Sequence, residues 1–168
     1  MTLNIEALTA FVVKAKKAAY AGDGAEVPAA KIQTPGFKEL SFTEGKWEYR
    51  DSYAGYFLAP GREVVWFQGQ PVWMMAYAGG MTPEHRRDKP FAKQTFTFLK
   101  RALSQASMNR PFRGPLHFTE GDYSYSDIFS GTIIEFTGRE YIQHQGKKVF
   151  QQRYIGGLIL PKEPAQSL

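Results

Sequence analysis

Apolar residues recur along the chain at two spacings, one typical of helices and one typical of strands. Residues 4–20 and about 90–107 each carry an apolar stripe at i, i+3, i+4 and i+7 spacing, which predicts two amphipathic helices capped by Asn4 and Asp88. The lysines of the first helix are expected to face solvent: Lys14, Lys16 and Lys17. After each helix, apolar and polar residues alternate between glycine-containing turns, which predicts four short antiparallel strands. Residues 25–38 lack such a period and are interpreted as a surface connection.

The two strand runs repeat each other. LSFTEGKWEYRDSYAG, from Leu40, aligns with LHFTEGDYSYSDIFSG, from Leu116, at an offset of 76 residues. With one inserted residue the alignment covers residues 40–81 and 116–158 and holds 17 identical pairs in 42 positions, where roughly two to four are expected by chance. The identical pairs include Tyr49/Tyr125, Asp51/Asp127, Glu63/Glu140 and Tyr77/Tyr154.

The repeat predicts an α+β fold made by internal duplication of a helix and a four-stranded antiparallel meander (α-β4-α-β4). One domain would then hold two pseudo-symmetric units, about 4–81 and 90–158, followed by a tail at 159–168. The helices are expected to pack on antiparallel sheet, and the alternative is a closed or nearly closed barrel of the eight strands. Gly69 and Gly146 lie in equivalent two-residue turns and are expected to have positive φ.

Composition limits the chemistry. With 43% hydrophobic residues in 168, the chain can form a core, and its apolar runs and N-terminus suggest a cytoplasmic protein without membrane spans or a secretory signal. It has no cysteine, which excludes disulfides and thiolate chemistry. The three histidines have no neighbours at ligand spacing, so we expect neither a metal nor another cofactor: His85, His117 and His144.

Most of the net charge of +5 lies in the connection between the repeats. Between Glu84 and Arg113 eight basic residues face two acidic ones: Arg86, Arg87, Lys89, Lys93, Lys100, Arg101, Arg110 and Arg113 against Glu84 and Asp88. This segment could bind a polyanion, but a solvated helix between exposed loops gives the same count. Nucleic-acid binding is therefore expected to be weak or absent.

Asp51 and Asp127 are the leading candidate site residues. Each is expected on a strand face shared with aromatic residues, so the candidate ligand-binding set is Trp47, Tyr49, Asp51, Tyr123, Tyr125 and Asp127. A carboxylate on an apolar face needs a partner, because its desolvation is costly. One interpretation is a pair of carboxyls with raised pKa, suited to acid/base catalysis or to binding a cationic or sugar-like ligand. The other is structural, with each Asp hydrogen-bonded to a turn or paired with an arginine.

Two further acidic residues also repeat. Arg62-Glu63 and Arg139-Glu140 begin equivalent strands, and adjacent strand residues point to opposite faces. Glu63 and Glu140 are therefore expected to form structural bridges across strands rather than to pair with the neighbouring arginine.

Several segments resemble an uncharacterised bacterial domain family. They are AKKAAYAGDGAE, WEYRDSYAG, VVWFQGQPVWMMAY, PFRGP, GDYSYSD and FTGREYI followed by a GG pair, and they span residues from about 6 to 158. Some members of that family look like the C-terminal partner of a helix-turn-helix DNA-binding domain. The resemblance implies a non-enzymatic sensor or regulatory domain that binds a small molecule or a protein. The alternatives are an enzyme that uses Asp51 or Asp127 as acid/base, and a weak nucleic-acid binder.

Overall fold

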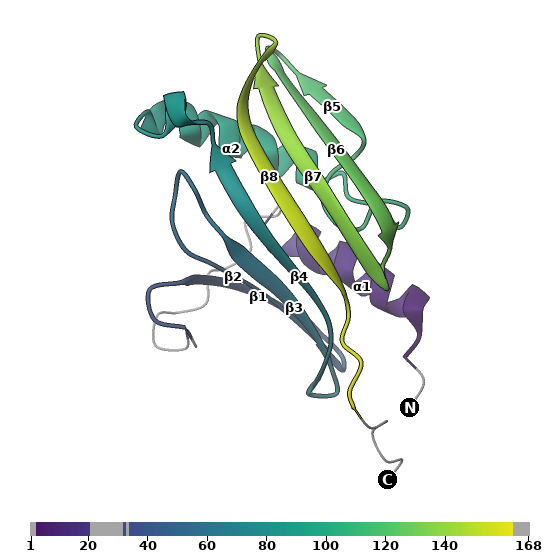
Figure 1. Cartoon of the computed structure of the whole chain (residues 1–168). Helices are drawn as coiled ribbons and strands as arrows, with labels where there is room; N and C mark the ends of the chain where they lie inside the picture. Colours follow the sequence, from purple (N-terminus) through teal and green to yellow (C-terminus); the bar gives the residue numbers. More distant parts are fainter. Residues whose placement is uncertain (1–2, 21–31, 33, 163–168) are drawn as a thin grey trace.

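A computed structural model describes residues 3–20, 32 and 34–162 of the chain. Most of the connection expected at 25–38, with the glycines that follow the first helix, lies outside these residues. Helices and strands occur in the predicted order (Figure 1). Their bounds are α1 Ile5–Ala18, β1 Lys38–Glu44, β2 Trp47–Tyr53, β3 Gly61–Phe67, β4 Gln70–Met81, the 3₁₀ helix η2 Pro83–His85, α2 Lys89–Leu103, β5 His117–Glu120, β6 Tyr123–Thr132, β7 Glu135–His144 and β8 Lys147–Leu158.

The eight strands form one antiparallel sheet in the order β1-β2-β3-β4-β8-β7-β6-β5. The α+β class and the antiparallel pairing predicted from the sequence are thus confirmed. In the part of the chain that the structure describes, β1 and β5 are the edges of this sheet, so the alternative of a closed barrel is wrong. The strand order reads alike from both edges, and the two strand sets meet where β4 pairs with β8.

Both helices lie behind the sheet in Figure 1 and cover one of its faces. The buried stripe of α1 packs with residues of the first strand set, such as Val65 and Trp73. The stripe of α2 packs with Tyr125, Ile142 and Phe150 of the second set. Each helix begins at its expected cap, because the side chain of Asn4 accepts from Ala7 N and that of Asp88 from Phe91 N. The helix α2 ends at Leu103, four residues before the predicted end.

The two equivalent hairpin turns have the predicted backbone. Gly69 and Gly146 each have φ of 77°, and the preceding residues, Gln68 and Gln145, also have positive φ, 53° and 49°. Positive φ at both central residues defines a type I′ turn, whose twist matches that of the flanking strands.

Glycines let the two strand sets approach closely at the β4–β8 pairing. A Cβ atom on Gly79 would lie 2.2 Å from the carbonyl oxygen of Gln151, and one on Gly156 would lie 2.4 Å from that of Met74. Neither distance is possible without moving backbone. Gly79 also has φ of 153°, which side-chain-bearing residues seldom adopt. The GG pairs repeated in the sequence therefore serve the junction between the two strand sets.

We predict that Gly79→Ala and Gly156→Ala each lower the free energy of unfolding by about 1–3 kcal/mol, because the added methyl group forces β4 and β8 apart. Chemical denaturation of the purified variants measures this. Ala78→Ser, at an exposed position next to Gly79, is the control and should change stability by less than about 0.5 kcal/mol. Glycine variants as stable as the control would show that the junction tolerates a wider spacing.

Candidate functional site

Four carboxyl groups lie on the helix-covered face of the sheet. Asp51 on β2 is directly opposite Glu63 on β3, and Asp127 on β6 is directly opposite Glu140 on β7. Their exposed fractions are between 0% and 4%. Like charges placed opposite each other across strands repel, and buried carboxylates lose their hydration, so this arrangement requires partners from elsewhere.

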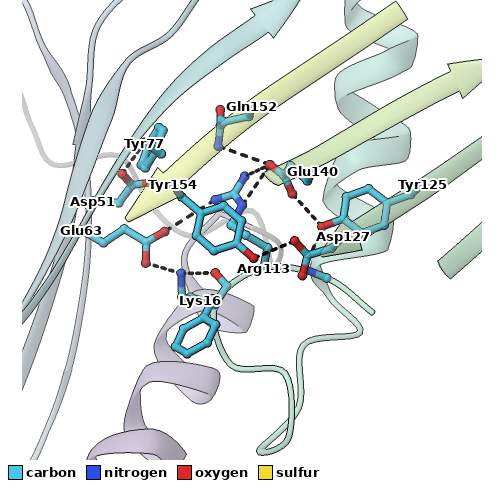
Figure 2. Close-up of polar contacts among 12 residues, drawn as sticks. Lys16, Asp51, Glu63, Tyr77, Arg113, Tyr125, Asp127, Glu140, Gln152 and Tyr154 are labelled. Carbon is cyan, nitrogen blue, oxygen red and sulfur yellow. Dashed lines mark hydrogen bonds and ion pairs between the residues drawn. The ribbon is translucent and has the colours of Figure 1, made fainter. Parts of the chain in front are cut away.

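Arg113, in the connection between α2 and β5, joins the two carboxyl pairs (Figure 2). Its guanidinium donates to Oε1 of Glu140 from Nε (3.0 Å) and from Nη2 (2.7 Å). Its Nη1 lies 3.6 Å from Oε1 of Glu63. Burial lowers the pKa of Arg113, but the charge and hydrogen bonds of Glu140, together with the charge of Glu63, outweigh this and hold the pKa above its ordinary value. Arg113 is therefore a permanent buried cation between the two strand sets.

Lys16, on α1, supplies a second buried cation. Its ammonium pairs with Glu63 and donates to the carbonyl oxygen of Phe112 (2.7 Å). Lys16 is 7% exposed, so the expectation that it faces solvent is wrong. Burial lowers its pKa, and Glu63 opposes that shift. One side chain thus ties α1 both to the sheet and to the connection that carries Arg113.

Two tyrosines hold the aspartates in equivalent ways. The hydroxyl of Tyr77 donates to Oδ1 of Asp51 (2.6 Å), and that of Tyr154 donates to Oδ1 of Asp127 (2.7 Å). Each ring passes over a glycine on the neighbouring strand. A Cβ on Gly61 would lie 2.5 Å from the Tyr77 hydroxyl oxygen, and one on Gly138 would lie 2.3 Å from the Tyr154 ring. These glycines, also identical between the repeats, leave room for the tyrosine–aspartate bonds.

Glu140 is the most fully bonded of the four carboxyls. Besides Arg113, it accepts from the hydroxyl of Tyr125 (2.6 Å) and from the side-chain amide of Gln152 (3.3 Å). The bridge across strands predicted for Glu140 is thus present. The cations that pair with Glu63 and Glu140 come from α1 and from the connection after α2, not from a strand, and the sequence pattern did not indicate this.

The two aspartates differ in one contact. Nη2 of Arg110 donates to Oδ2 of Asp127 (3.1 Å) and to its carbonyl oxygen (2.6 Å). The same guanidinium lies over the ring of Phe129, 4.8 Å from its centroid. Asp51 forms no ion pair with any residue that the structure describes; its hydrogen bond from Tyr77 is its one direct polar contact there.

Both aspartates have raised pKa values. Burial, with the charge of Glu63 as the next cause, raises the pKa of Asp51 to about 7. Burial, with the charge of Glu140, raises that of Asp127 to about 6, against the lowering effects of Tyr154 and Arg110. Of the two aspartates, Asp51 therefore has the pKa closer to neutral pH.

A cavity of about 710 Å³ opens between the sheet and the helices beside Asp51. Asp51 and Glu63 line it together with Lys16 and Arg113, and tyrosines line the same space: Tyr20, Tyr49, Tyr53, Tyr56 and Tyr77. Residues of α2, such as Thr97 and Lys100, form the opposite wall. Asp127 is not among the lining residues. The acid/base interpretation required both aspartates to line one cleft, and they do not.

The other predicted site residues lie away from the cavity. Trp47 stacks on Phe11 of α1, with ring centroids 5.3 Å apart, and Tyr123 stacks on Phe98 of α2 at 5.1 Å. Tyr125 is fully buried and accepts a hydrogen bond from Gly114 N (3.0 Å). Of the candidate set, only Tyr49 and Asp51 reach the cavity. Lys16, Glu63, Tyr77 and Arg113 were absent from that set, although the identity of Glu63 with Glu140 and of Tyr77 with Tyr154 was a usable signal.

The basic connection is not one exposed surface. Arg110 and Arg113 turn inward to Asp127 and Glu140, contrary to the expectation that they flank α2 on exposed loops. Arg86 donates to the carbonyl oxygen of Met81 (3.1 Å), and Arg101 pairs with Glu120. Much of the excess positive charge therefore serves the fold.

Neither a membrane-spanning helix nor a metal-binding cluster occurs among the described residues. No helix among residues 3–20, 32 and 34–162 has the length and apolar character to cross a membrane. No three or more His, Cys, Asp or Glu side chains of those residues are grouped so that they could hold a metal ion.

The fold and its central charges define an α+β domain whose two strand sets meet around a buried arginine. Residues 51–159 match a family described as a domain of unknown function, DUF5680, and the chain belongs to that family. Among curated proteins and among solved structures, no match is found.

The raised pKa of Asp51 predicts how stability changes with pH. A carboxyl whose pKa rises on folding binds more protons in the folded state, so its contribution is complete below about pH 4 and is lost as pH rises toward about 7. Asp51→Asn removes this loss and can still accept from Tyr77. We expect the unfolding free energy of Asp51→Asn to fall less than that of the wild type between pH 4 and pH 8, by on the order of 1–3 kcal/mol.

Denaturant unfolding at several pH values measures the difference. Glu135→Gln, which removes an exposed strand carboxyl, is the control and should follow the wild-type curve. Parallel curves for Asp51→Asn and wild type would mean that Asp51 has an ordinary pKa.

Proposed function

We propose that the chain is a non-enzymatic, ligand-binding domain with a regulatory role, and that its ligand is a small molecule bound in the cavity beside Asp51. The cavity itself is the observation that supports this most strongly. At about 710 Å³ it falls in the size range of small-molecule sites, which combine aromatic walls with a few convergent polar groups. Here tyrosine rings form the walls, and Asp51, Lys16 and Arg113 are the convergent groups.

The resemblance to domains that accompany a helix-turn-helix supports the regulatory part of this proposal. In such an arrangement, a ligand that binds one domain changes the activity of its neighbour. We also propose that residues 1–168 are one domain, in which units at about 4–81 and 90–158 arose by duplication. The equivalent tyrosine–aspartate bonds and the sheet order that reads alike from both edges support that origin.

An enzymatic role is the second candidate, because Asp51 has a pKa near 7 and lines the cavity. A carboxyl of this kind could donate or accept a proton during catalysis at neutral pH. The two roles differ in one result. If the domain is an enzyme, Asp51→Asn would still bind a substrate but would not convert it.

Filling the cavity tests the proposed function. Thr97 lies on α2, is exposed and lines the cavity, so Thr97→Trp places an indole there with little loss of core packing. Gln94→Trp, at an exposed position on the same helix and outside the cavity lining, is the matched control. Thermal unfolding is measured with a chemically diverse set of small metabolites.

We expect at least one compound to raise the melting temperature of the wild type and of Gln94→Trp, and to have no effect on Thr97→Trp. At a concentration of about 100 times Kd the gain is about 2.7 kcal/mol, or roughly 5–10 °C for a chain of this size. If no compound stabilises the wild type, or if compounds stabilise all three proteins equally, the proposal is wrong.

A further inference from the structure

Both repeats contain an aspartate and an aromatic ring that can bind a cation, but only the second repeat has an arginine bound to them. Around Asp127 the arrangement is complete: the guanidinium of Arg110 contacts the Asp127 carboxylate and carbonyl oxygen and lies over Phe129. At the 76-residue offset, Asp51 corresponds to Asp127 and Tyr53 corresponds to Phe129. The same offset, extended six residues before the aligned stretch, places Thr34, which carries no charge, at the position of Arg110.

The counterparts of the receiving groups face the cavity. Asp51 and Tyr53 both line it, and Tyr77 holds the Asp51 carboxyl as Tyr154 holds that of Asp127. Among the residues that the structure describes, none pairs with Asp51 as Arg110 pairs with Asp127. The cavity thus adjoins the place that a guanidinium occupies in the other half.

The buried charges also favour an added cation. The central groups comprise four carboxyls, Asp51, Glu63, Asp127 and Glu140, and three cations, Lys16, Arg110 and Arg113. With a proton on Asp51 these charges balance. A cation placed against Asp51 would replace that proton and let the carboxyl ionise.

The far wall and mouth of the cavity carry basic side chains, in contrast to the carboxyl group of Asp51. Basic side chains of β1 and α2 line this part of the cavity: Lys38, Lys93, Lys100 and Arg101. Arg101 pairs with Glu120, whereas the exposed ammonium of Lys93 forms no ion pair with any residue that the structure describes. The charge of Lys93 repels a purely cationic molecule and attracts an anionic group. A ligand that satisfies both regions carries a cation at one end and an anion at the other.

We propose that the cavity binds a zwitterionic small molecule whose guanidinium or ammonium group lies against Asp51 and over Tyr53, as Arg110 lies against Asp127 and over Phe129. The anionic end, a carboxylate or phosphate, faces Lys93 of α2. The inference rests on the proposed function, since it names the ligand class of the same cavity.

L-arginine, L-citrulline and agmatine are the probes for this proposal. L-citrulline replaces the guanidinium of L-arginine by an uncharged urea of nearly the same shape, and agmatine lacks the carboxylate. Binding to the wild type, to Asp51→Asn and to Thr97→Trp is measured by isothermal titration calorimetry, with NMR for millimolar affinities. We expect L-arginine to bind best, with L-citrulline about tenfold or more weaker and agmatine weaker than L-arginine.

Asp51→Asn should reduce L-arginine binding by about tenfold or more, and Thr97→Trp should abolish it. Thermal unfolding establishes that both variants are folded. Equal binding of L-arginine and L-citrulline, or an unchanged affinity in Asp51→Asn, would overturn the inference, as would a wild type that binds neither L-arginine nor agmatine at 10 mM.

The pH dependence gives a readout that needs no variant. Asp51 is surrounded by charged and titratable groups of several elements: Glu63, Lys16, Arg113, Tyr20, Tyr49, Tyr53, Tyr77 and, at the cavity wall, Lys38. Since a cation binds the ionised carboxyl, the affinity for L-arginine should rise between pH 6 and pH 8, with proton release on binding. An affinity that falls over this range would mean that the ligand uses protonated Asp51, which overturns the inference.

These outcomes are distinguishable from failure of the proposed function. If neutral or purely anionic compounds from the diverse set stabilise the wild type and not Thr97→Trp, the cavity is a binding site and only the ligand class is wrong. If no compound of any class binds, the proposed function fails with it.

Discussion

The buried guanidinium of Arg113 is the contact on which the centre of this fold depends. It pairs with Glu140 of one strand set and Glu63 of the other, and Glu63 also pairs with Lys16 of α1. Four elements distant in sequence thus meet at a small group of charges. Breaking a buried pair of this kind typically costs about 3–5 kcal/mol, because the remaining charge has no partner. The carboxyls therefore require the connection after α2 to lie where it does.

The same network explains why the two aspartates differ. Asp127 has Arg110 as a partner from that connection, whereas the first half of the chain has no arginine at the corresponding position. Burial and the charge of Glu63 raise the pKa of Asp51 to about 7 with no such arginine to oppose them, and Asp51 lies at the wall of the large cavity. The aspartate of the second repeat is paired with an arginine, and that of the first repeat is not. This difference is the basis of the ligand class that we propose.

Much of the fold could be predicted from local pattern, because helix stripes, strand alternation and the Gln-Gly turns depend on neighbouring residues. The identical Asp51 and Asp127 also indicated where to look. The partners could not be predicted in the same way. A pattern of apolar and polar residues places Lys16 on the solvent side of its helix, because lysine is charged. Its burial depends on an ion pair with Glu63, 47 positions later in the chain. From the sequence, Arg113 was one of several basic residues in the connection between the repeats, and only the structure shows that it pairs with Glu140. The cavity is lined by residues of α2 and of β2, β3, β4 and β8, and pattern alone does not place a helix across a sheet.

A crystal structure of the protein soaked with L-arginine at pH 8 would test the central claim most directly. The account predicts the guanidinium group against the Asp51 carboxylate and over the Tyr53 ring, with the carboxylate of the ligand toward α2. A structure in which a side chain of the protein itself pairs with Asp51, or in which L-arginine binds elsewhere and leaves the cavity empty, would contradict it.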